Sequence, residues 1–135
     1  MKILILNGSP HRDGSTSEMA DALKRGAEEA GHEVVSYNVA HMNIRGCMAC
    51  EYCREKEKGT CCQKDDMQIL YPEILSADMV VFASPIYYFT LSAQLQAVIH
   101  RTYAIDIKIT APHLRLFCRR WGVVLYHAIK AGRLP

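Results

Sequence analysis

Four cysteines within fifteen residues are the side chains of this sequence best suited to chemistry. They follow the pattern Cys-x2-Cys-x2-Cys-x7-Cys at Cys47, Cys50, Cys53 and Cys61. Three cysteines in so short a run are typical of a loop that wraps an iron–sulfur cubane, with a fourth thiolate nearby. Zinc sites more often use two separated pairs. The run therefore favours iron over zinc, with oxidisable thiols or an ancestral, emptied site as alternatives, and Cys62 could replace the adjacent Cys61.

A hydroxyl-rich segment between an apolar run and a helical pattern has the composition of an anion-binding loop. Residues 7–16 have the sequence Asn-Gly-Ser-Pro-His-Arg-Asp-Gly-Ser-Thr. Backbone amides and the helix dipole favour an anion at such a position. The spacing fits neither Gly-x-Gly-x-x-Gly nor Gly-x4-Gly-Lys-Ser/Thr. The many hydroxyls therefore predict a terminal monophosphate, and the alternative is an ordinary strand-to-helix turn with a good cap.

An aromatic segment follows the third apolar run. Residues 84–89 have the sequence Ser-Pro-Ile-Tyr-Tyr-Phe. Ligands of open α/β sheets bind beyond the carboxyl ends of the strands, so this segment and residues 7–16 are expected at one edge of the sheet. Consecutive aromatic rings there could flank a flat ligand ring. The alternative is that Tyr87, Tyr88 and Phe89 pack between helix and sheet.

The elements that must position these segments alternate between strands and helices. Apolar runs predict strands over residues 3–6, 34–39, 79–83 and 121–126. Helices are predicted from Ser15, from Asp66 with a kink or restart at Pro72, and over residues 91–103. Such alternation predicts an α/β fold with a doubly wound parallel sheet.

The first helix carries several local signals. Ser15 and Glu18 fit a capping box, and Gly31 is a natural left-handed stop. A stripe spaced by three and four residues is predicted to face the sheet: Met19, Ala22, Leu23, Gly26, Ala27 and Ala30. Farther along the chain, Asp65 and Asp66 are expected to cap a helix rather than to act as paired acids.

Together the three segments resemble a known family. Residues 7–16 resemble the Gly-Ser-Pro-Arg-x-x-Gly-Asn-Thr signature of flavodoxin-like NAD(P)H-dependent FMN reductases, with His11 at the arginine position and Ser15 at the asparagine position. Residues 84–88 resemble that family's Ser-Pro-x-Tyr flavin loop, and residues 46–67 are similar to the cysteine segment of its iron–sulfur flavoprotein branch. The resemblance covers roughly residues 1–103 and implies a flavodoxin-like sheet of order 2-1-3-4-5.

The resemblance implies roles for the matching residues. The FMN phosphate would be held by Ser9, His11, Arg12, Ser15 and Thr16. The isoalloxazine would be lined by Pro85, Ile86, Tyr87, Tyr88 and Phe89. A 4Fe–4S cluster would be ligated by Cys47, Cys50, Cys53 and Cys61.

The same resemblance implies an activity without a catalytic acid or base. Electrons would pass from NAD(P)H or a ferredoxin-like donor through FMN to a quinone, a flavin or another acceptor. The alternative is a non-enzymatic flavin or iron–sulfur electron carrier, or a thiol-based redox sensor. The partners implied are a small-molecule donor and acceptor, and family membership implies a homodimer or homotetramer.

Composition limits the other classes of function. A length of 135 residues predicts one domain. The resemblance implies that this is an FMN-binding domain over residues 1–135, with a cysteine-rich insertion at about 46–62. The net charge of +2 gives no support to nucleic-acid binding. Residues 79–99 carry no charge, but Pro85 and several polar residues favour strand, loop and helix over a membrane span. Six cysteines without a signal peptide predict a reducing, cytoplasmic location.

The resemblance fades after Tyr103. The fifth strand of the flavodoxin-like order is expected to be missing or divergent, so that strand 121–126 would form an edge open to pairing. The third flavin-contacting loop would have to come from residues 127–132, which carry no recognisable signature.

Overall fold

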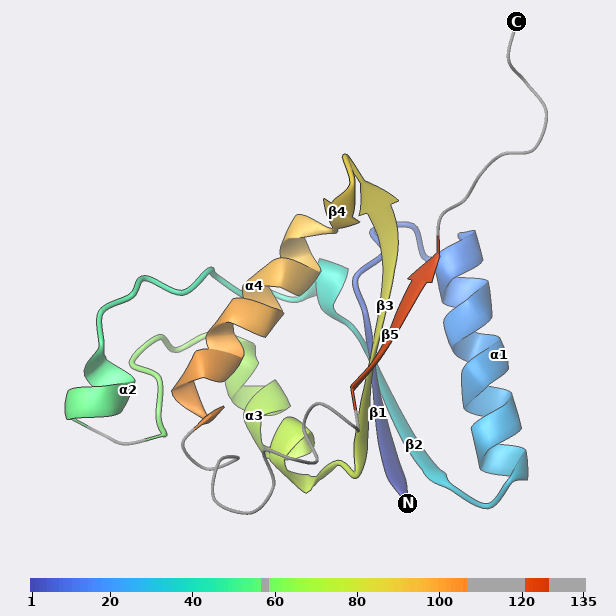
Figure 1. Ribbon diagram of the computed structural model, residues 1–135, viewed down its shortest axis with the longest axis horizontal. Helices are drawn as coiled ribbons and strands as arrows, with labels where there is room; N and C mark the ends of the chain where they lie inside the picture. The colour runs from blue at the N-terminus through green and yellow to red at the C-terminus, as the bar shows by residue number, and fades with distance from the viewer. Residues whose placement is uncertain (57–58, 107–120, 127–135) are drawn as a thin grey trace, which may run out of the picture.

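Four parallel strands form the centre of the molecule (Figure 1). The computed structural model describes residues 1–56, 59–106 and, for the backbone, 121–126. The strands are β1 (Lys2–Asn7), β2 (Glu33–Asn38), β3 (Met79–Tyr87) and β5 (Trp121–Tyr126). They lie in the order β2-β1-β3-β5, and every neighbouring pair is parallel. This confirms the predicted flavodoxin-like fold, with β5 in the place of the predicted fourth strand. The described residues contain no fifth parallel strand, and residues 127–132 lie outside them.

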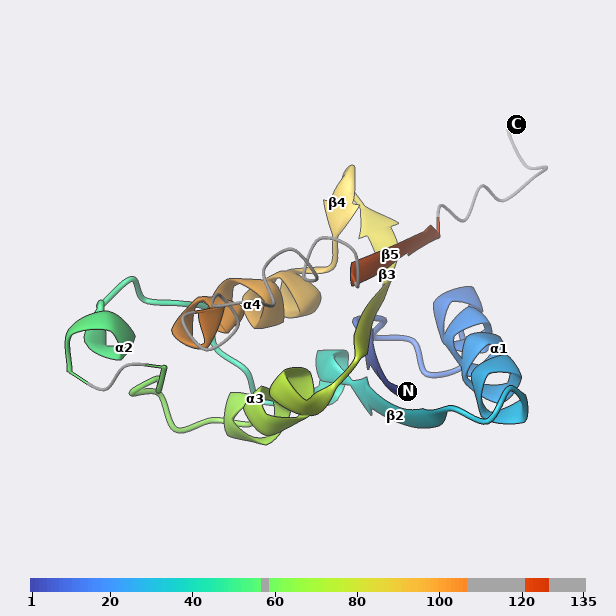
Figure 2. The ribbon, with the colours of Figure 1, turned by 60° about the horizontal axis from the view of Figure 1, so that its bottom comes forward.

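Helices cover both faces of the sheet (Figure 2). One face is covered by α1 (Ser15–Glu29), and the other by α3 (Met67–Ser76) and α4 (Ala93–Arg101). The short helix α2 (Tyr52–Glu55) lies beyond α4, on the side away from α1. Two 3-10 turns, η1 (Val39–His41) and η2 (Thr102–Ala104), follow β2 and α4.

The core has two halves because successive strand residues point to opposite faces. Leu4, Leu6 and Phe82 are buried in the cluster that includes residues of α3 and α4. Ile5 and Val81 alternate with them and pack in the cluster that includes α1. Strands β1 and β3 are therefore apolar on both faces, as is typical of a parallel sheet between helical layers.

Helix α1 begins where predicted but turns a different face inward. Its N-cap is Gly14, with no side-chain cap, so the predicted capping box at Ser15 is wrong. Most of the predicted inward stripe is also wrong, since Met19 and Leu23 are 38% and 40% exposed. The buried residues are Thr16, Ser17 and Ala20. The polar first turn faces inward because Ser17 hydrogen-bonds the preceding loop.

The segment after β3 is more regular than predicted. The strand predicted over residues 79–83 is longer than expected: β3 continues to Tyr87 and turns back into β4 (Thr90–Leu91). Ile86 and Leu91 pair antiparallel across a turn of two residues, Tyr88 and Phe89.

The remaining helices follow the predicted pattern with local departures. Helix α3 runs without interruption through Pro72, contrary to the predicted restart, and turns Leu75 toward solvent. In α4 the buried side chains include Arg101, which the apolar pattern does not reveal. Gly31 has a φ of 80°, as its predicted role as a helix stop requires. No helix within the described parts of the chain is long and apolar enough to span a membrane.

Candidate functional site

The hydroxyl-rich loop and the aromatic segment lie side by side at the carboxyl edge of the sheet. Asn7 and Ala83 are in register on β1 and β3, and the Gly8 amide donates to the Ala83 carbonyl at 2.7 Å. The loop also touches the start of α4, because a Cβ on Gly8 would lie 2.5 Å from the Ser92 Oγ. The sheet therefore brings together the two segments that the sequence predicted to share one edge.

Side chains of the first loop organise its own backbone. The Asn7 Oδ1 accepts a hydrogen bond from the Ser9 amide at 2.9 Å, and the Asn7 Nδ2 donates to the Ser17 Oγ at 3.0 Å. The hydroxyls of Ser9 and Ser17 both donate to the His11 carbonyl at 3.1 Å. On the β2 side, the Asn38 Nδ2 donates to the Ser9 carbonyl at 3.2 Å. These bonds fix a closed loop in front of α1.

The residues predicted to hold phosphate divide into two groups. His11, Arg12 and Ser15 are exposed, whereas Ser9 and Thr16 are buried. The Ser9 hydroxyl is already bonded within the loop, so it shapes the loop. Gly14, the N-cap of α1, has no side chain that could accept a hydrogen bond from the first amides of the helix. An anion would therefore not compete with a side-chain cap for these amides. The site would therefore attract an anion through helix amides, with exposed donors from neighbouring residues.

Asn7 and Asn38 form part of this site together with Ser17, although sequence reasoning assigned no role to the two asparagines. Ser17 is buried in the first turn of α1, and the other two residues end β1 and β2. The usable signal was their position, because a polar residue that ends a buried strand must find a partner at the sheet edge.

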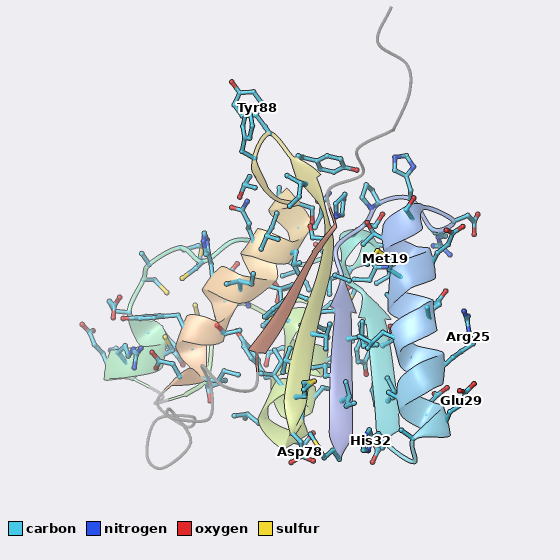
Figure 3. All side chains as sticks on the ribbon, turned by 45° about the vertical axis from the view of Figure 1, so that its right-hand side comes forward. Met19, Arg25, Glu29, His32, Asp78 and Tyr88 are labelled. Atoms are coloured by element: carbon cyan, nitrogen blue, oxygen red, sulfur yellow. The ribbon has the colours of Figure 1, made fainter. Side chains whose placement is uncertain are left out.

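The aromatic segment forms an exposed hairpin tip. Tyr88 and Phe89 are 95% and 96% exposed, which contradicts the alternative that these rings pack between helix and sheet. Tyr88 projects away from the body of the molecule (Figure 3). The two rings meet edge to face with centroids 5.8 Å apart. Their φ values of 48° and 66° are unusual for bulky residues and match a type I′ two-residue turn.

The base of this hairpin is buried and hydrogen-bonded, in contrast to its exposed tip. The Ser84 side chain is fully buried, and its Oγ accepts from the Ser92 amide at 2.9 Å and donates to the Pro85 carbonyl at 2.8 Å. Pro85 and Ile86 are half-buried. The predicted flavin-lining residues therefore extend from a fixed strand end to freely exposed rings.

The cysteines lie on a loop that two left-handed residues shape. Ala49 and Glu51 have φ values of 52° and 56° on either side of Cys50. The Glu51 carbonyl then accepts hydrogen bonds from the first turn of α2, in which Cys53 is buried. Five cysteines line one cavity of about 20 Å³: Cys47, Cys50, Cys53, Cys61 and Cys62. All four predicted ligands, and the adjacent Cys62, thus meet in one place.

The thiols of this cavity differ in their environment. The Sγ atoms of Cys50 and Cys62 lie 3.6 Å apart. A backbone hydrogen bond at Tyr52, and then the Cys62 thiol, lower the pKa of Cys50. The same contact raises the pKa of Cys62, and burial raises the pKa of Cys53. Of these two thiols Cys50 therefore loses its proton more readily, and its sulfur would then accept a hydrogen bond from the Cys62 thiol.

Buried polar contacts close the base of the cysteine loop. The side chains of Arg101 and Asp65 are each 1% exposed and form two bonds, of 2.6 and 3.0 Å. The Asp65 Oδ2 also accepts from the Arg45 amide at 3.1 Å, and the Asp66 Oδ2 accepts from the Asn43 amide at 2.7 Å. The N-cap of α3 is Asp66, whose side chain makes no cap, so the predicted cap by Asp66 is wrong. The Asp65 Oδ1 instead accepts from the Met67 amide at 3.2 Å, and Asp65 thereby joins both ends of the loop.

The charges of this pair are secured by each other. Burial disfavours the charged form of Arg101, yet the hydrogen bonds from Asp65 raise its pKa above the ordinary value. Burial likewise acts against the Asp65 carboxylate, but Arg101 holds the pKa of Asp65 below its usual value. The base of the loop therefore contains a permanent ion pair at neutral pH.

A second set of contacts holds α2 against η2, the 3-10 turn that directly follows α4, and against Asp106 beyond it. The Arg54 guanidinium bonds the Asp106 carboxylate at 2.6 Å and lies 4.1 Å from the centre of the Tyr103 ring. The Tyr103 hydroxyl donates to the Glu51 carboxylate at 3.1 Å. The cysteine loop is therefore attached to the same helix whose other end contacts the first loop.

Comparison with known proteins assigns this arrangement to a family. The family described as NADPH-dependent FMN reductase matches residues 1–132. The chain belongs to the NADPH-dependent FMN reductase family. An iron-sulfur flavoprotein of Archaeoglobus fulgidus is 37% identical over 75% of the chain and 45% of that protein. An iron-sulfur flavoprotein of Methanocaldococcus jannaschii is 34% identical over 80% of the chain and 54% of that protein.

A solved structure supports the same relationship. The NAD(P)H:quinone oxidoreductase from Methanothermobacter marburgensis has a TM-score of 0.63 at 27% identity, over 76% of this chain and 53% of that chain. The chain spans about half the length of the curated relatives named here. Family membership confirms the resemblance drawn from the three segments of the sequence.

The cysteine residues fit an iron–sulfur cluster by donor chemistry. A tetrahedral zinc ion with bonds of about 2.3 Å needs sulfurs about 3.8 Å apart. In the described ranges, no three suitable side chains converge enough to hold one metal ion. A cubane is wider than one ion, and thiolates are its usual ligands. The cavity of about 20 Å³ has room for about one water, so the loop must widen to admit such a cluster.

Proposed function

We propose that this protein is an FMN-dependent oxidoreductase that takes electrons from NAD(P)H or a ferredoxin-like donor. Its acceptor is a quinone, a flavin or another small carrier. Bound FMN would supply the chemistry that links two-electron donors to one-electron acceptors. The protein's own residues bind the flavin, orient it and decide which donors reach it.

The observation that carries this proposal is the pairing of two segments at one sheet edge. The amino end of α1 lacks a side-chain cap and suits the flavin phosphate. Exposed donors of the same loop, His11, Arg12 and Ser15, would complete the cradle with Ser9 and Thr16. Residues 85–89, from Pro85 to Phe89, would line the isoalloxazine, because β3 ends beside that loop.

The cysteine loop is proposed to hold a 4Fe–4S cluster through Cys47, Cys50, Cys53 and Cys61. Support comes from the shared cavity, the soft donor set and the two curated relatives named above. Such a cluster would give the flavin a one-electron partner. The protein is further proposed to act as a homodimer or homotetramer in the cytoplasm.

A second candidate function is thiol-based redox sensing. The observation that favours it is the exposed pair of Cys50 and Cys62, with sulfurs 3.6 Å apart. A low-molecular-weight disulfide could oxidise these two thiols to one disulfide and be reduced to two thiols in return. Cluster binding through Cys50 would prevent that reaction.

Anaerobic reconstitution with FMN, iron and sulfide separates these functions. We expect flavin bands with a broad iron–sulfur shoulder, about one FMN and four irons per chain, and bleaching of the flavin by NADPH. A C47S/C50S variant serves as control and is expected to keep FMN while losing iron. Flavin binding without bleaching would identify a carrier rather than an enzyme, and a chain that binds neither group would contradict both flavin-based readings.

A further inference from the structure

Arg101 is a buried cation in the wall of the cysteine cavity. Its side chain is 1% exposed, and it lines the cavity together with the cysteines. Arginine is almost never this buried unless its donors are bonded. Cys61 lies close enough to interact electrostatically with the guanidinium. The last residue of α4 thus brings a permanent positive charge to the sulfurs.

One nitrogen of this guanidinium, Nε, has no hydrogen-bond partner among the described residues. The Nη1 atom donates to Asp65 at 2.6 Å and to the Arg45 carbonyl at 2.9 Å, and the Nη2 atom donates to Asp65 at 3.0 Å. The Nε atom is buried and has no hydrogen-bond partner. A buried N–H without an acceptor costs free energy. The ion pair with Asp65 uses the other two nitrogens and does not need the Nε–H. An acceptor in the adjoining cavity would remove that cost.

We infer that Arg101 is a positioning residue for the cysteine site, whose Nε–H donates to a cysteine sulfur or cluster sulfide. This inference rests on the proposed cluster. Asp65 fixes the plane of the guanidinium by bonding both Nη1 and Nη2. The direction of the Nε–H bond is therefore fixed as well. Hydrogen bonds to cluster sulfurs stabilise added negative charge and so raise the reduction potential.

The test is a redox titration of the reconstituted cluster, followed by electron paramagnetic resonance. R101K keeps the cation but removes the Nε–H donor. We expect its midpoint potential to become more negative by up to about 59 mV. For a one-electron couple, that shift is a tenfold change in the ratio of reduced to oxidised cluster. R54K is the matched control, because Arg54 also forms an ion pair beside the loop but does not line the cavity. Its potential should equal that of the unmodified protein.

A second variant guards against misfolding. R101Q combined with D65N replaces the ion pair by two neutral amides and leaves no unpaired buried charge. At equal iron and sulfide content, its potential should also be lowered. Should neither variant fold, the unmodified protein decides the question, because loading the cluster should broaden and shift the Nε–H resonance of Arg101.

The outcomes separate this inference from the function on which it rests. A protein that assembles no iron and sulfide contradicts the proposed cluster and this inference together. A cluster that assembles normally, with unchanged potentials in both variants or an unchanged Nε–H resonance on loading, overturns only the role of Arg101.

Discussion

Replacing Gly8 by alanine should destabilise the protein strongly, because the first loop packs directly on α4. A Cβ at this position would lie 2.5 Å from the Ser92 Oγ and 2.7 Å from the Leu95 Cβ. Both neighbours are fully buried and cannot move aside freely. Overpacking of this kind costs about 1–3 kcal/mol. Displacing the Ser92 hydroxyl, which caps α4 through the Leu95 amide, adds about 1 kcal/mol.

We therefore expect G8A to lose about 2–4 kcal/mol of unfolding free energy. Urea unfolding measures this as a lower midpoint at an unchanged slope. G26A is the matched control, since a Cβ on Gly26 meets nothing within 4 Å on the exposed side of α1. That variant should gain about 0.5–1 kcal/mol from helix propensity. A G8A protein within about 0.5 kcal/mol of the unmodified one would refute the close packing of loop and helix.

Three further variants test the site. S17A removes a buried hydroxyl that joins two parts of the first loop. It should lower the free energy of unfolding in urea by about 1–3 kcal/mol and weaken FMN binding. S15A, at an exposed position, is the control and should change stability little. Y88N combined with F89G places Asn-Gly, the preferred sequence of a type I′ turn, at the two residues with positive φ. It should raise the thermal midpoint by removing about 1 kcal/mol of backbone strain. It should also weaken FMN binding, measured by fluorescence. Since the folded-state pKa of Asp65 is depressed, its contribution to stability is present above the unfolded value of about 3.9 and is lost as pH falls through the lower folded value. D65N should therefore be less stable than the unmodified protein at pH 7, and that difference should shrink in acid unfolding experiments.

The central strands β1 and β3 were predictable because burial on both faces leaves a continuous apolar run. Residues 3–6 and 121–126 became β1 and β5, and their order followed from the alternation of strands with helices. The start of α1 was predictable from the glycine- and serine-rich loop before it. Its inward face was not, because Ser17 enters a loop network that periodicity cannot show.

The sequence predicted that the cysteines lie together, but it did not predict the contacts that support their loop. The spacing of the run brought Cys47 to Cys61 into one cavity. The pairing of Asp65 with Arg101 joins residues 36 positions apart, and neither belongs to a local pattern. A single arginine at the end of an otherwise apolar helix stripe was the available signal, since a buried cation needs a buried partner. The hairpin after β3 was missed because bulky residues rarely adopt positive φ.

Binding of FMN compared with riboflavin tests the central claim most directly. The two ligands share the isoalloxazine and differ in the phosphate that the amino end of α1 is proposed to hold. Two charge-assisted hydrogen bonds of about 1.5 kcal/mol each correspond to about a 100-fold difference in affinity. Titration followed by flavin fluorescence should give one FMN per chain and about 100-fold weaker riboflavin binding. Equal affinities would contradict the phosphate cradle, and no binding of either ligand would contradict the flavin-dependent function itself.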